Sequence, residues 1–214
     1  MIWSLFTTMN SSLKHYIERE IIPLYLSFDK AHSLDHVNQV IEQSLQLAQH
    51  YDVDIDMVYT IAAYHDTGLC KGREYHHISS GEILAADNRL QEFFSPEQIT
   101  TMVEAVEDHR ASNKNEPRTI YGRIVAEADR CLDPMTVIRR TVQFGLKHYP
   151  TLTTDEHFTR CCDHLTEKYG PNGYLKLWIP QSDNAQKLTN LRQIAANKPL
   201  LRTIFNQIMT EEKF

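Results

Sequence analysis

The chain is 214 residues long, and its composition of 42% hydrophobic and 23% charged residues is ordinary for a soluble globular protein with one sizeable core. Its 28 acidic residues outnumber 22 lysines and arginines, which leaves a formal charge of −6 and no broad basic field for non-specific binding to nucleic acid. We therefore expect no long nucleic-acid partner, whereas local basic side chains and a bound divalent cation are compatible with a small phosphorylated substrate.

The cysteines and the start of the chain indicate a cytoplasmic protein. Cys70, Cys131, Cys161 and Cys162 form no C-x-x-C pair, so we expect reduced thiols rather than a zinc knuckle or a disulfide framework. The first residues lack a basic segment followed by a long apolar stretch, and no run of about 18 apolar residues occurs. We predict a cytoplasmic location and no membrane partner.

Apolar residues at helical spacing dominate the chain, and the alternating runs typical of hairpins are absent, so we predict an all-α fold. The first expected helix covers residues 12–28 and is bent at Pro23. A second helix covers residues 33–51, where Ser33 can cap the N-terminus and His36 lies at the edge of the apolar stripe. The stripe of the first helix consists of Leu13, Ile17, Ile21, Leu24 and Phe28.

The segment 55–67 is apolar on nearly every face and is expected to form a central buried helix that ends at Gly68. This helix places His65 and Asp66 in apolar surroundings. Burying an unpaired carboxylate costs several kcal/mol, so a cationic partner is required. That partner is either a basic side chain or a metal ion.

Two more expected helices carry polar residues on their apolar faces. The first begins at Ser95 and Pro96, and its apolar stripe continues to His109. The second lies within residues 118–134. There Asp129 follows a stripe valine by one helical turn, so we expect its side chain to project toward packed neighbours.

Beyond residue 150 we expect a helix at 154–169, a turn at "YGPNGY" and a helical tail from about 184 to 212. We expect one domain over residues 1–214, with a motif-bearing core at about 20–150 and a helical C-terminal extension at 151–214. The extension carries no obvious chemistry. We expect it to cover the bundle or to meet a partner subunit in a homo-oligomer.

Four polar residues thus lie on or beside the buried faces of three helices, in the order H…HD…D: His36, His65, Asp66 and Asp129. Two imidazoles and two carboxylates form a mixed nitrogen and oxygen site that suits a borderline or hard divalent ion. A site that lacks thiolates and keeps open positions is typical of a catalytic metal. The alternative is core histidines held by hydrogen bonds and carboxylates paired with arginines, but no matching set of basic residues lies on the same faces.

This order of residues resembles the HD-domain superfamily of metal-dependent phosphohydrolases over roughly residues 20–150, and "AEADRCLD" resembles the family's closing segment. The resemblance implies an all-α bundle, with the H-D pair at the C-terminal end of a buried helix. It also implies that His36, His65, Asp66 and Asp129 are ligands of a divalent ion. The ion would be Mn²⁺, Fe²⁺, Ni²⁺, Mg²⁺ or Zn²⁺, with one or two ions in each chain.

Further histidines extend the expected site. In relatives, histidines of the intervening helices serve as extra ligands, phosphate contacts or proton donors, and His77 and His109 occupy such helices. We expect His77 to point inward and His76 to turn away. His32 lies one turn before His36 and can share its helical face. The expected inward face of His77 contains Gly81, Leu84 and Ala85.

Basic residues near the motifs are candidates for binding the substrate. Lys71 and Arg73 directly follow the H-D pair, and Arg110 follows His109. Such cations bind phosphate oxygens. We therefore predict that these three side chains contact the substrate.

We expect an enzyme that hydrolyses a phosphoester in a small, nucleotide-like substrate. Asp66 would orient a metal-bound water, and His77 or His109 would protonate the leaving oxygen. Two alternatives stay open: an HD-type di-iron oxygenase, for which His77 and His109 would supply extra ligands, and a regulatory HD module that binds a nucleotide without chemistry. No further motif distinguishes an alarmone hydrolase from a deoxynucleotide triphosphohydrolase.

Overall fold

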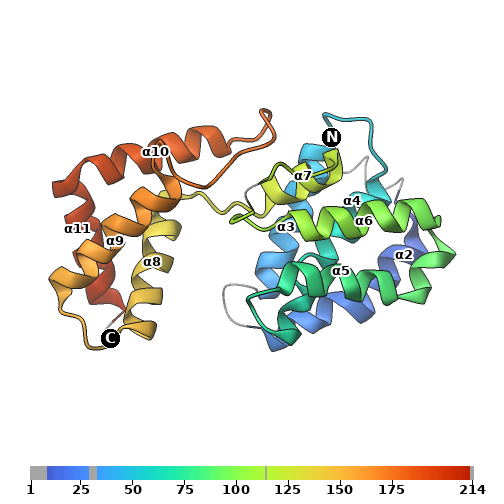
Figure 1. Ribbon diagram of the computed structural model, residues 1–214, viewed down its shortest axis with the longest axis horizontal. Coiled ribbons are helices and arrows are strands. Elements are labelled where there is room, and N and C mark those ends of the chain that lie inside the picture. The colour runs from blue at the N-terminus through green and yellow to red at the C-terminus, as the bar shows by residue number, and fades with distance from the viewer. Residues whose placement is uncertain (1–8, 29–32, 114, 213–214) are drawn as a thin grey trace. The chain divides into compact units, whose positions relative to one another are not determined.

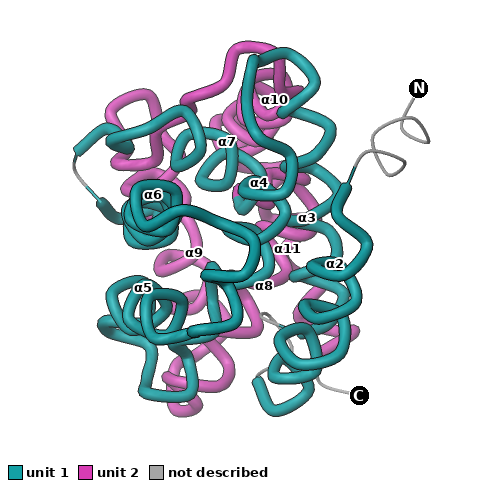
Figure 2. Tube along the Cα trace, turned by 90° about the vertical axis from the view of Figure 1, so that its right-hand side faces the viewer, with its two compact units in different colours: residues 1–129 teal, residues 130–214 magenta. Residues whose placement is uncertain are grey.

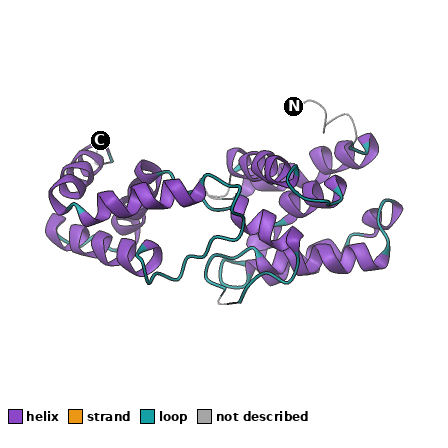
Figure 3. Cartoon of the chain, turned by 90° about the horizontal axis from the view of Figure 1, so that it is seen from above, coloured by secondary structure: helices purple, strands orange, loops and turns teal. Residues whose placement is uncertain are grey.

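The computed structural model describes residues 9–28, 33–113 and 115–212. These residues form helices joined by loops, with no strand among them, which confirms the predicted all-α fold (Figure 1, Figure 3). No helix within these ranges is long and apolar enough to cross a membrane.

Contacts divide the chain into two compact units, residues 1–129 and 130–214 (Figure 2). The division falls within the segment 20–150 that we expected to form one core, and it groups the helix that begins at Pro134 with the C-terminal helices. That the whole chain folds as a single domain stays a prediction.

The first unit is packed around one buried helix, α4 (Ile55–Tyr64). The other elements of this unit are α2 (Ser11–Tyr16), the π-helix η1 (Ile17–Ile21), the 3-10 helix η2 (Ile22–Ser27), α3 (Leu34–Ala48), the 3-10 helix η4 (Thr67–Lys71), α5 (His76–Ala86), the 3-10 helix η5 (Asn88–Glu92), α6 (Pro96–Asp108) and α7 (Ile120–Ala128). Helix α4 contacts α3, α5, α6, α7 and η1. All of its residues from 57 to 64 are buried, which confirms the expected central helix.

The predicted helix at residues 12–28 is present as three consecutive elements with different winding, α2, η1 and η2. Pro23 lies in the first turn of η2. A proline is tolerated there because the first N–H groups of a helix have no partner within it. The winding changes from π-helical to 3-10 next to Pro23, and the bend that we expected there stays a prediction.

The π-helix changes which side chains of this segment face the core. A turn with i to i+5 hydrogen bonds holds more residues than an α-helical turn, so residues four positions apart stay on one face. Leu13, Ile17, Ile21 and Tyr25 are accordingly buried. Leu24, which we placed on the apolar stripe, is 43% exposed, and that prediction was wrong.

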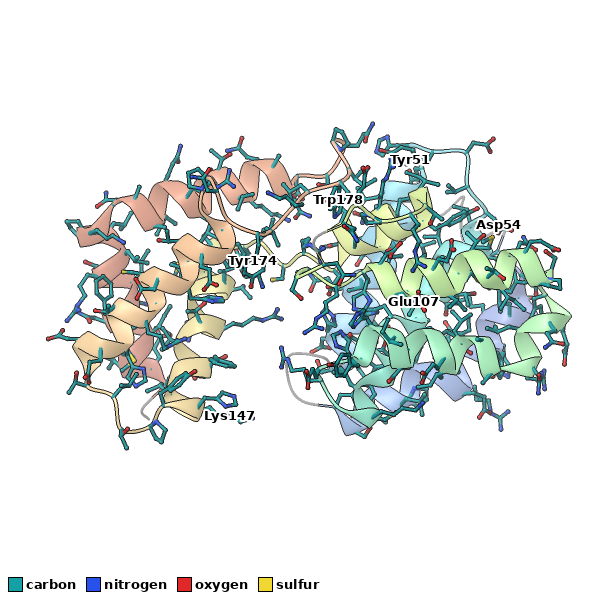
Figure 4. The ribbon with its side chains drawn as sticks, in the orientation of Figure 1. Tyr51, Asp54, Glu107, Lys147, Tyr174 and Trp178 are labelled. Atoms are coloured by element: carbon teal, nitrogen blue, oxygen red, sulfur yellow. The ribbon has the colours of Figure 1, made fainter. Side chains whose placement is uncertain are left out.

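Asp54, labelled in Figure 4, joins the N-terminal ends of three helices. Its Oδ1 caps α4 by accepting hydrogen bonds from the N–H groups of Asp56 and Met57, at 2.9 and 3.3 Å. Its Oδ2 accepts a hydrogen bond from the side-chain amide of Gln98 in α6, and its N–H donates to the hydroxyl of Tyr121 in α7. The helices α4, α6 and α7 therefore start from a common point.

The capping of α6 follows the sequence. The Ser95 hydroxyl accepts a hydrogen bond from the N–H of Gln98, and the Gln98 side chain accepts one from the N–H of Ser95. This reciprocal capping box confirms the predicted start of the helix. The buried face of α6 continues through Met102 and Val106 to His109, also as predicted.

Helix α4 ends at Tyr64, three residues before the predicted end. His65 caps the helix, and Asp66 lies in the turn between α4 and η4. This turn brings both side chains to the end of the buried helix. Their position agrees with the one that the resemblance implied.

Gly68 allows η4 to pack directly against the start of α5. A Cβ atom on this glycine would lie 2.2 Å from the carbonyl oxygen of His76 and 2.4 Å from the backbone nitrogen of Ser80. The N–H of Gly68 donates a hydrogen bond to the Ser80 hydroxyl at 2.8 Å. The glycine after the H-D pair is therefore required by close backbone packing.

The second unit contains α8 (Pro134–His148), α9 (Thr154–Tyr169), α10 (Asn184–Ala196) and α11 (Lys198–Glu211). Helix α9 has the predicted bounds, and Pro134 begins a new helix, which is one of the two roles that we expected for it. The expected helical tail is two helices, because the chain turns at Asn197 and Pro199 lies in the first turn of α11. Covering the bundle and meeting a partner subunit both stay predictions.

Candidate metal centre

Six side chains from separate segments lie together in the first unit and form the candidate metal centre. Three of them, His65, His109 and Asp129, are the C-cap residues of α4, α6 and α7. The partial negative charge at the C-terminal ends of these three helices favours a cation. The other members are His36 in α3, Asp66 after α4, and His76, the first residue of α5.

The first group of ligand atoms comes from the four residues predicted as metal ligands. His36 Nε2 lies 3.2 Å from His65 Nε2 and 3.2 Å from Asp129 Oδ1. Oδ2 of Asp66 lies 3.2 Å from His65 Nε2 and 3.5 Å from His36 Nε2. The fold therefore brings the H…HD…D residues together: atoms of His36, His65 and Asp66 are close enough to hold one ion, and Asp129 lies beside His36.

The second group lies on the other side of the Asp66 carboxylate. Oδ1 of Asp66 is 3.3 Å from His76 Nε2 and 3.5 Å from His109 Nε2. The two imidazole nitrogens are 3.3 Å apart. Asp66 thus offers one oxygen to each group and is shared between two potential metal sites.

The backbone orients three of the imidazole rings. In each, Nδ1 lies within hydrogen-bond distance of the carbonyl oxygen three residues earlier in the chain. The Nδ1–H group donates to that carbonyl, so in the neutral ring Nε2 carries the lone pair that a metal ion can bind. The Nδ1–O distances are 2.7 Å for His65 and Ala62, 2.8 Å for His76 and Arg73, and 2.6 Å for His109 and Val106.

Asp66 is almost fully buried, with 2% of its surface exposed. Its ion-pair partners among the described residues are the four histidines of the centre, and no lysine or arginine pairs with it there. This excludes the alternative reading of Asp66 as a structural partner of a described arginine. A buried carboxylate surrounded by imidazoles is the arrangement expected of a metal ligand.

The protonation states show how the centre balances its charge. Burial lowers the pKa of His36, but the carboxylates of Asp129 and Asp66 outweigh burial and raise this pKa to about 9. Burial raises the pKa of Asp66, but His65, His109 and His36 hold it well below its usual value. The pKa of Asp129 is lowered in the same way, chiefly by His36. Protonated imidazoles therefore balance the negative charge of the two carboxylates. A divalent cation can replace these protons and supply the same positive charge.

The donor atoms fit a divalent metal. The six residues supply four imidazole nitrogens and two carboxylates without a thiolate, a set suited to Mn²⁺, Fe²⁺, Ni²⁺ or Zn²⁺. Orientation of the rings by backbone carbonyls is the usual second layer around such an ion. The predicted divalent-metal site is thus supported by the chemistry of its donors.

His76, and not His77, belongs to the second group, which corrects our expectation. Helix α5 begins at His76, and its buried residues include Ser80 and Leu84, one and two turns later on the same edge. Ala85, which we placed on the inward face with His77, is exposed. The ring of His77 is half-buried and lies 5.7 Å from the ring of His76.

The three predicted substrate-binding residues lie at the periphery. Lys71 pairs with Glu82 at 2.9 Å, and Nη1 of Arg110 donates to the carbonyl of Glu74 at 2.6 Å. Arg73 has an exposed side chain, while its carbonyl holds His76. Contact of these residues with a substrate stays a prediction. His32 lies outside the described residues.

Tyr25 is a supporting residue that the sequence analysis missed. Its buried hydroxyl donates to the carbonyl of Ala63 at 2.9 Å and accepts a hydrogen bond from the N–H of Asp66 at 3.2 Å. Its pKa is raised well above the usual value by burial and by the Asp66 carboxylate, so the hydroxyl keeps its proton. In the sequence, Tyr25 lies four residues after Ile21, at the same spacing as the buried residues before it. This spacing indicates burial only if the segment is known to contain a π-helix.

Comparison with protein-family models matches residues 33–132 to the HD domain. The matched segment contains all six residues of the metal centre. Searches of curated proteins and of solved structures gave no match. This match of residues 33–132 to the HD domain confirms the resemblance drawn from the H…HD…D order.

Proposed function

We propose that the protein is a metal-dependent phosphohydrolase that acts on a small, nucleotide-like phosphoester. The observation that carries this proposal is the position of Asp66, whose two carboxylate oxygens face two separate groups of histidines. A carboxylate in this position is suited to bridging two divalent ions, and paired ions are typical of enzymes that displace a group at phosphorus. The match of residues 33–132 to the HD domain supports the same assignment, because that family consists mostly of metal-dependent hydrolases.

The residues of the centre would hold up to two ions. A divalent ion bound here would supply a water of lowered pKa and would polarise a phosphoryl oxygen. The protein's contribution is to keep the ligand atoms oriented before the substrate arrives, through the backbone carbonyls and the Tyr25 hydroxyl. We assign His36, His65, Asp66 and Asp129 to the first ion, and Asp66, His76 and His109 to the second.

His77 and His109, which we expected to donate a proton to the leaving oxygen, have different roles in this proposal. His109 faces Asp66 through Nε2 and is assigned as a ligand. Burial and the positive neighbours His109 and Arg110 lower the pKa of His77 to about 4, so this ring is neutral at pH 7 and a poor acid. Its Nδ1 is buried and has no hydrogen-bond partner among the described residues, which suits a contact with substrate.

A second candidate function is oxidation at a di-iron centre. A shared carboxylate flanked by imidazoles also suits two iron ions, so the same observation favours it. Two irons in each chain after purification without oxygen, together with an oxygen-dependent product, would support this candidate over hydrolysis. A purely regulatory module needs no such complete set of oriented ligands.

The proposal is tested by measuring bound metal and hydrolysis of a panel of phosphoesters and nucleotides. Asp66→Ala should lose both the metal and the activity. Asp52→Ala removes an exposed carboxylate from the same unit and should retain both. Full activity of Asp66→Ala, or its loss in Asp52→Ala as well, would overturn the assignment of Asp66 to the catalytic centre.

A further inference from the structure

A small, partly open cavity of about 210 Å³ is lined by residues at the ends of η2 and η4 and just after them. Its walls are formed by Ser27, Phe28, Leu69 and Arg73. This volume is below the roughly 300 to 1,000 Å³ of pockets that enclose a whole ligand, so it suits one part of a larger molecule.

Two backbone hydrogen bonds join the cavity wall to the metal ligands. The N–H of Leu69 donates to the carbonyl of Asp66 at 3.0 Å. The carbonyl of Arg73 accepts the hydrogen bond from Nδ1 of His76 at 2.8 Å. The backbones of Leu69 and Arg73 are therefore hydrogen-bonded to Asp66 and His76, two candidate metal ligands.

Aromatic rings connect the opposite wall to the same centre. The ring of Phe28 packs edge-on against the ring of Tyr25, with 5.3 Å between the centroids. The ring of Tyr25 lies 6.2 Å from that of His65. One buried tyrosine thus separates the half-buried Phe28 from a metal ligand.

The wall residues have complementary chemistry. Phe28 and Leu69 are half-buried and present apolar surface, whereas Ser27 and Arg73 are exposed and present a hydroxyl and a guanidinium. An aromatic ring packs on such an apolar wall, and a guanidinium binds the oxygens of a phosphate or stacks on a flat ring. A nucleotide carries both groups.

We infer that this cavity is the subsite for the base of a nucleoside monophosphate whose phosphate lies at the metal centre. The inference rests on the proposed phosphohydrolase function and specifies the substrate class. Phe28 and Leu69 contact the base, and Arg73 contacts the phosphate. Phe28 is therefore the residue that distinguishes a nucleotide from a phosphoester without a ring.

The test combines binding with kinetics in the metal-loaded protein. Adenosine has no phosphoester and is used as a binding probe by calorimetry, while adenosine 5′-monophosphate and glycerol 3-phosphate are compared by kcat/KM. Phe28→Leu should weaken adenosine binding about 10-fold and reduce the preference for the nucleotide by a similar factor. Arg73→Gln should lower kcat/KM for the nucleotide by a larger factor than it weakens adenosine binding, because adenosine has no phosphate.

Leu26→Ala is the matched control, because Leu26 lies in η2 two residues before Phe28, is 72% exposed and does not line the cavity. It should bind adenosine as the parent does. The melting temperature of each variant separates a local effect from loss of the fold.

The outcomes distinguish this inference from the proposed function. Adenosine binding that depends on Phe28, without hydrolysis of any phosphoester, would support the subsite and contradict the phosphohydrolase. Hydrolysis with no adenosine binding, or with a nucleotide preference that Phe28→Leu leaves unchanged, would overturn the subsite and leave the phosphohydrolase standing.

Discussion

The backbone N–H of Asp66 donates a hydrogen bond to the hydroxyl oxygen of Tyr25, at 3.2 Å. The same hydroxyl donates to the carbonyl of Ala63, so Tyr25 bridges the end of α4 and the turn that carries Asp66. A residue from the start of the chain thereby holds the H-D turn in the form that the centre needs.

Replacing Tyr25 should therefore weaken the centre. Tyr25→Phe leaves the N–H of Asp66 and the carbonyl of Ala63 without their buried partner, at a cost of about 1–3 kcal/mol in the free energy of unfolding. Loss of this support should lower metal affinity about 10- to 100-fold. Urea unfolding and metal titration measure the two effects. Tyr59, a buried tyrosine within α4, provides the control: Tyr59→Phe should leave metal affinity unchanged, and equal affinities in the two variants would contradict the role of Tyr25.

The two neighbouring histidines of α5 should differ in metal content. His76→Ala removes a ligand atom of the second group, so the number of ions in each chain should fall from two to one. His77→Ala should keep both ions, because its ring lies outside the group. Mass spectrometry of the metal-loaded proteins gives the stoichiometry. Loss of an ion in His77→Ala with none lost in His76→Ala would reverse the assignment.

Gly68→Ala should be strongly destabilising. Its Cβ would meet backbone atoms of α5 at 2.2 and 2.4 Å, and a backbone cannot move aside as a flexible side chain can. We expect a loss of at least about 1–3 kcal/mol in the free energy of unfolding and weaker binding at the second group, because α5 carries His76. Gly81→Ala is the matched control. There the nearest atom is the flexible Cγ of Glu107 at 3.1 Å, so the change should stay within about 1 kcal/mol, since alanine also favours the helix. Similar effects of the two substitutions would rule out the close packing at Gly68.

The metal-free protein should lose stability as the pH rises from about 6.5 to 9. The pKa of His36 is raised to about 9 in the folded state by Asp129 and Asp66 against the effect of burial, and is about 6.5 in the unfolded chain. The stabilisation by the imidazolium is therefore complete below about 6.5 and is lost as the pH passes 9. The decrease should be at most about 3 kcal/mol.

Urea unfolding at several pH values in the presence of a chelator measures how steeply the free energy of unfolding falls with pH. His36→Gln should flatten this slope, whereas His15→Gln, an exposed histidine of α2, should leave it unchanged. A slope that survives in His36→Gln would place the titrating group elsewhere.

Removing the metal should lower the melting temperature, and adding it back should restore the parent value. An ion that binds only the folded chain stabilises it by mass action, by about 4 kcal/mol at a thousand times its dissociation constant. The difference should be larger at pH 9 than at pH 7, because at pH 9 fewer imidazolium protons replace the ion. Asp129→Asn relieves the repulsion between carboxylates and weakens the site, so its melting temperature should respond less to chelator. An unchanged melting temperature on removing a demonstrably bound ion would contradict a ligand cluster in the core.

Local patterns were sufficient to predict the helices and the first group of ligands. Helical spacing placed His36, His109 and Asp129 beside apolar faces, and the apolar segment before His65 predicted a buried helix. Such patterns depend on neighbours within one or two turns, which the sequence displays directly. The H…HD…D order was therefore readable before the fold was known.

Only the tertiary structure decided which of two neighbouring residues in a helix faces the core or the metal centre. His76 rather than His77 joins Asp66, and Tyr25 rather than Leu24 faces the core. In an α-helix one residue corresponds to a rotation of about 100°, so the precise start of α5 and the π-helical winding before Tyr25 determine which side chain points inward. The start of α5 packs against Gly68, and the π-helix packs against α4; no periodic pattern in the sequence encodes either contact.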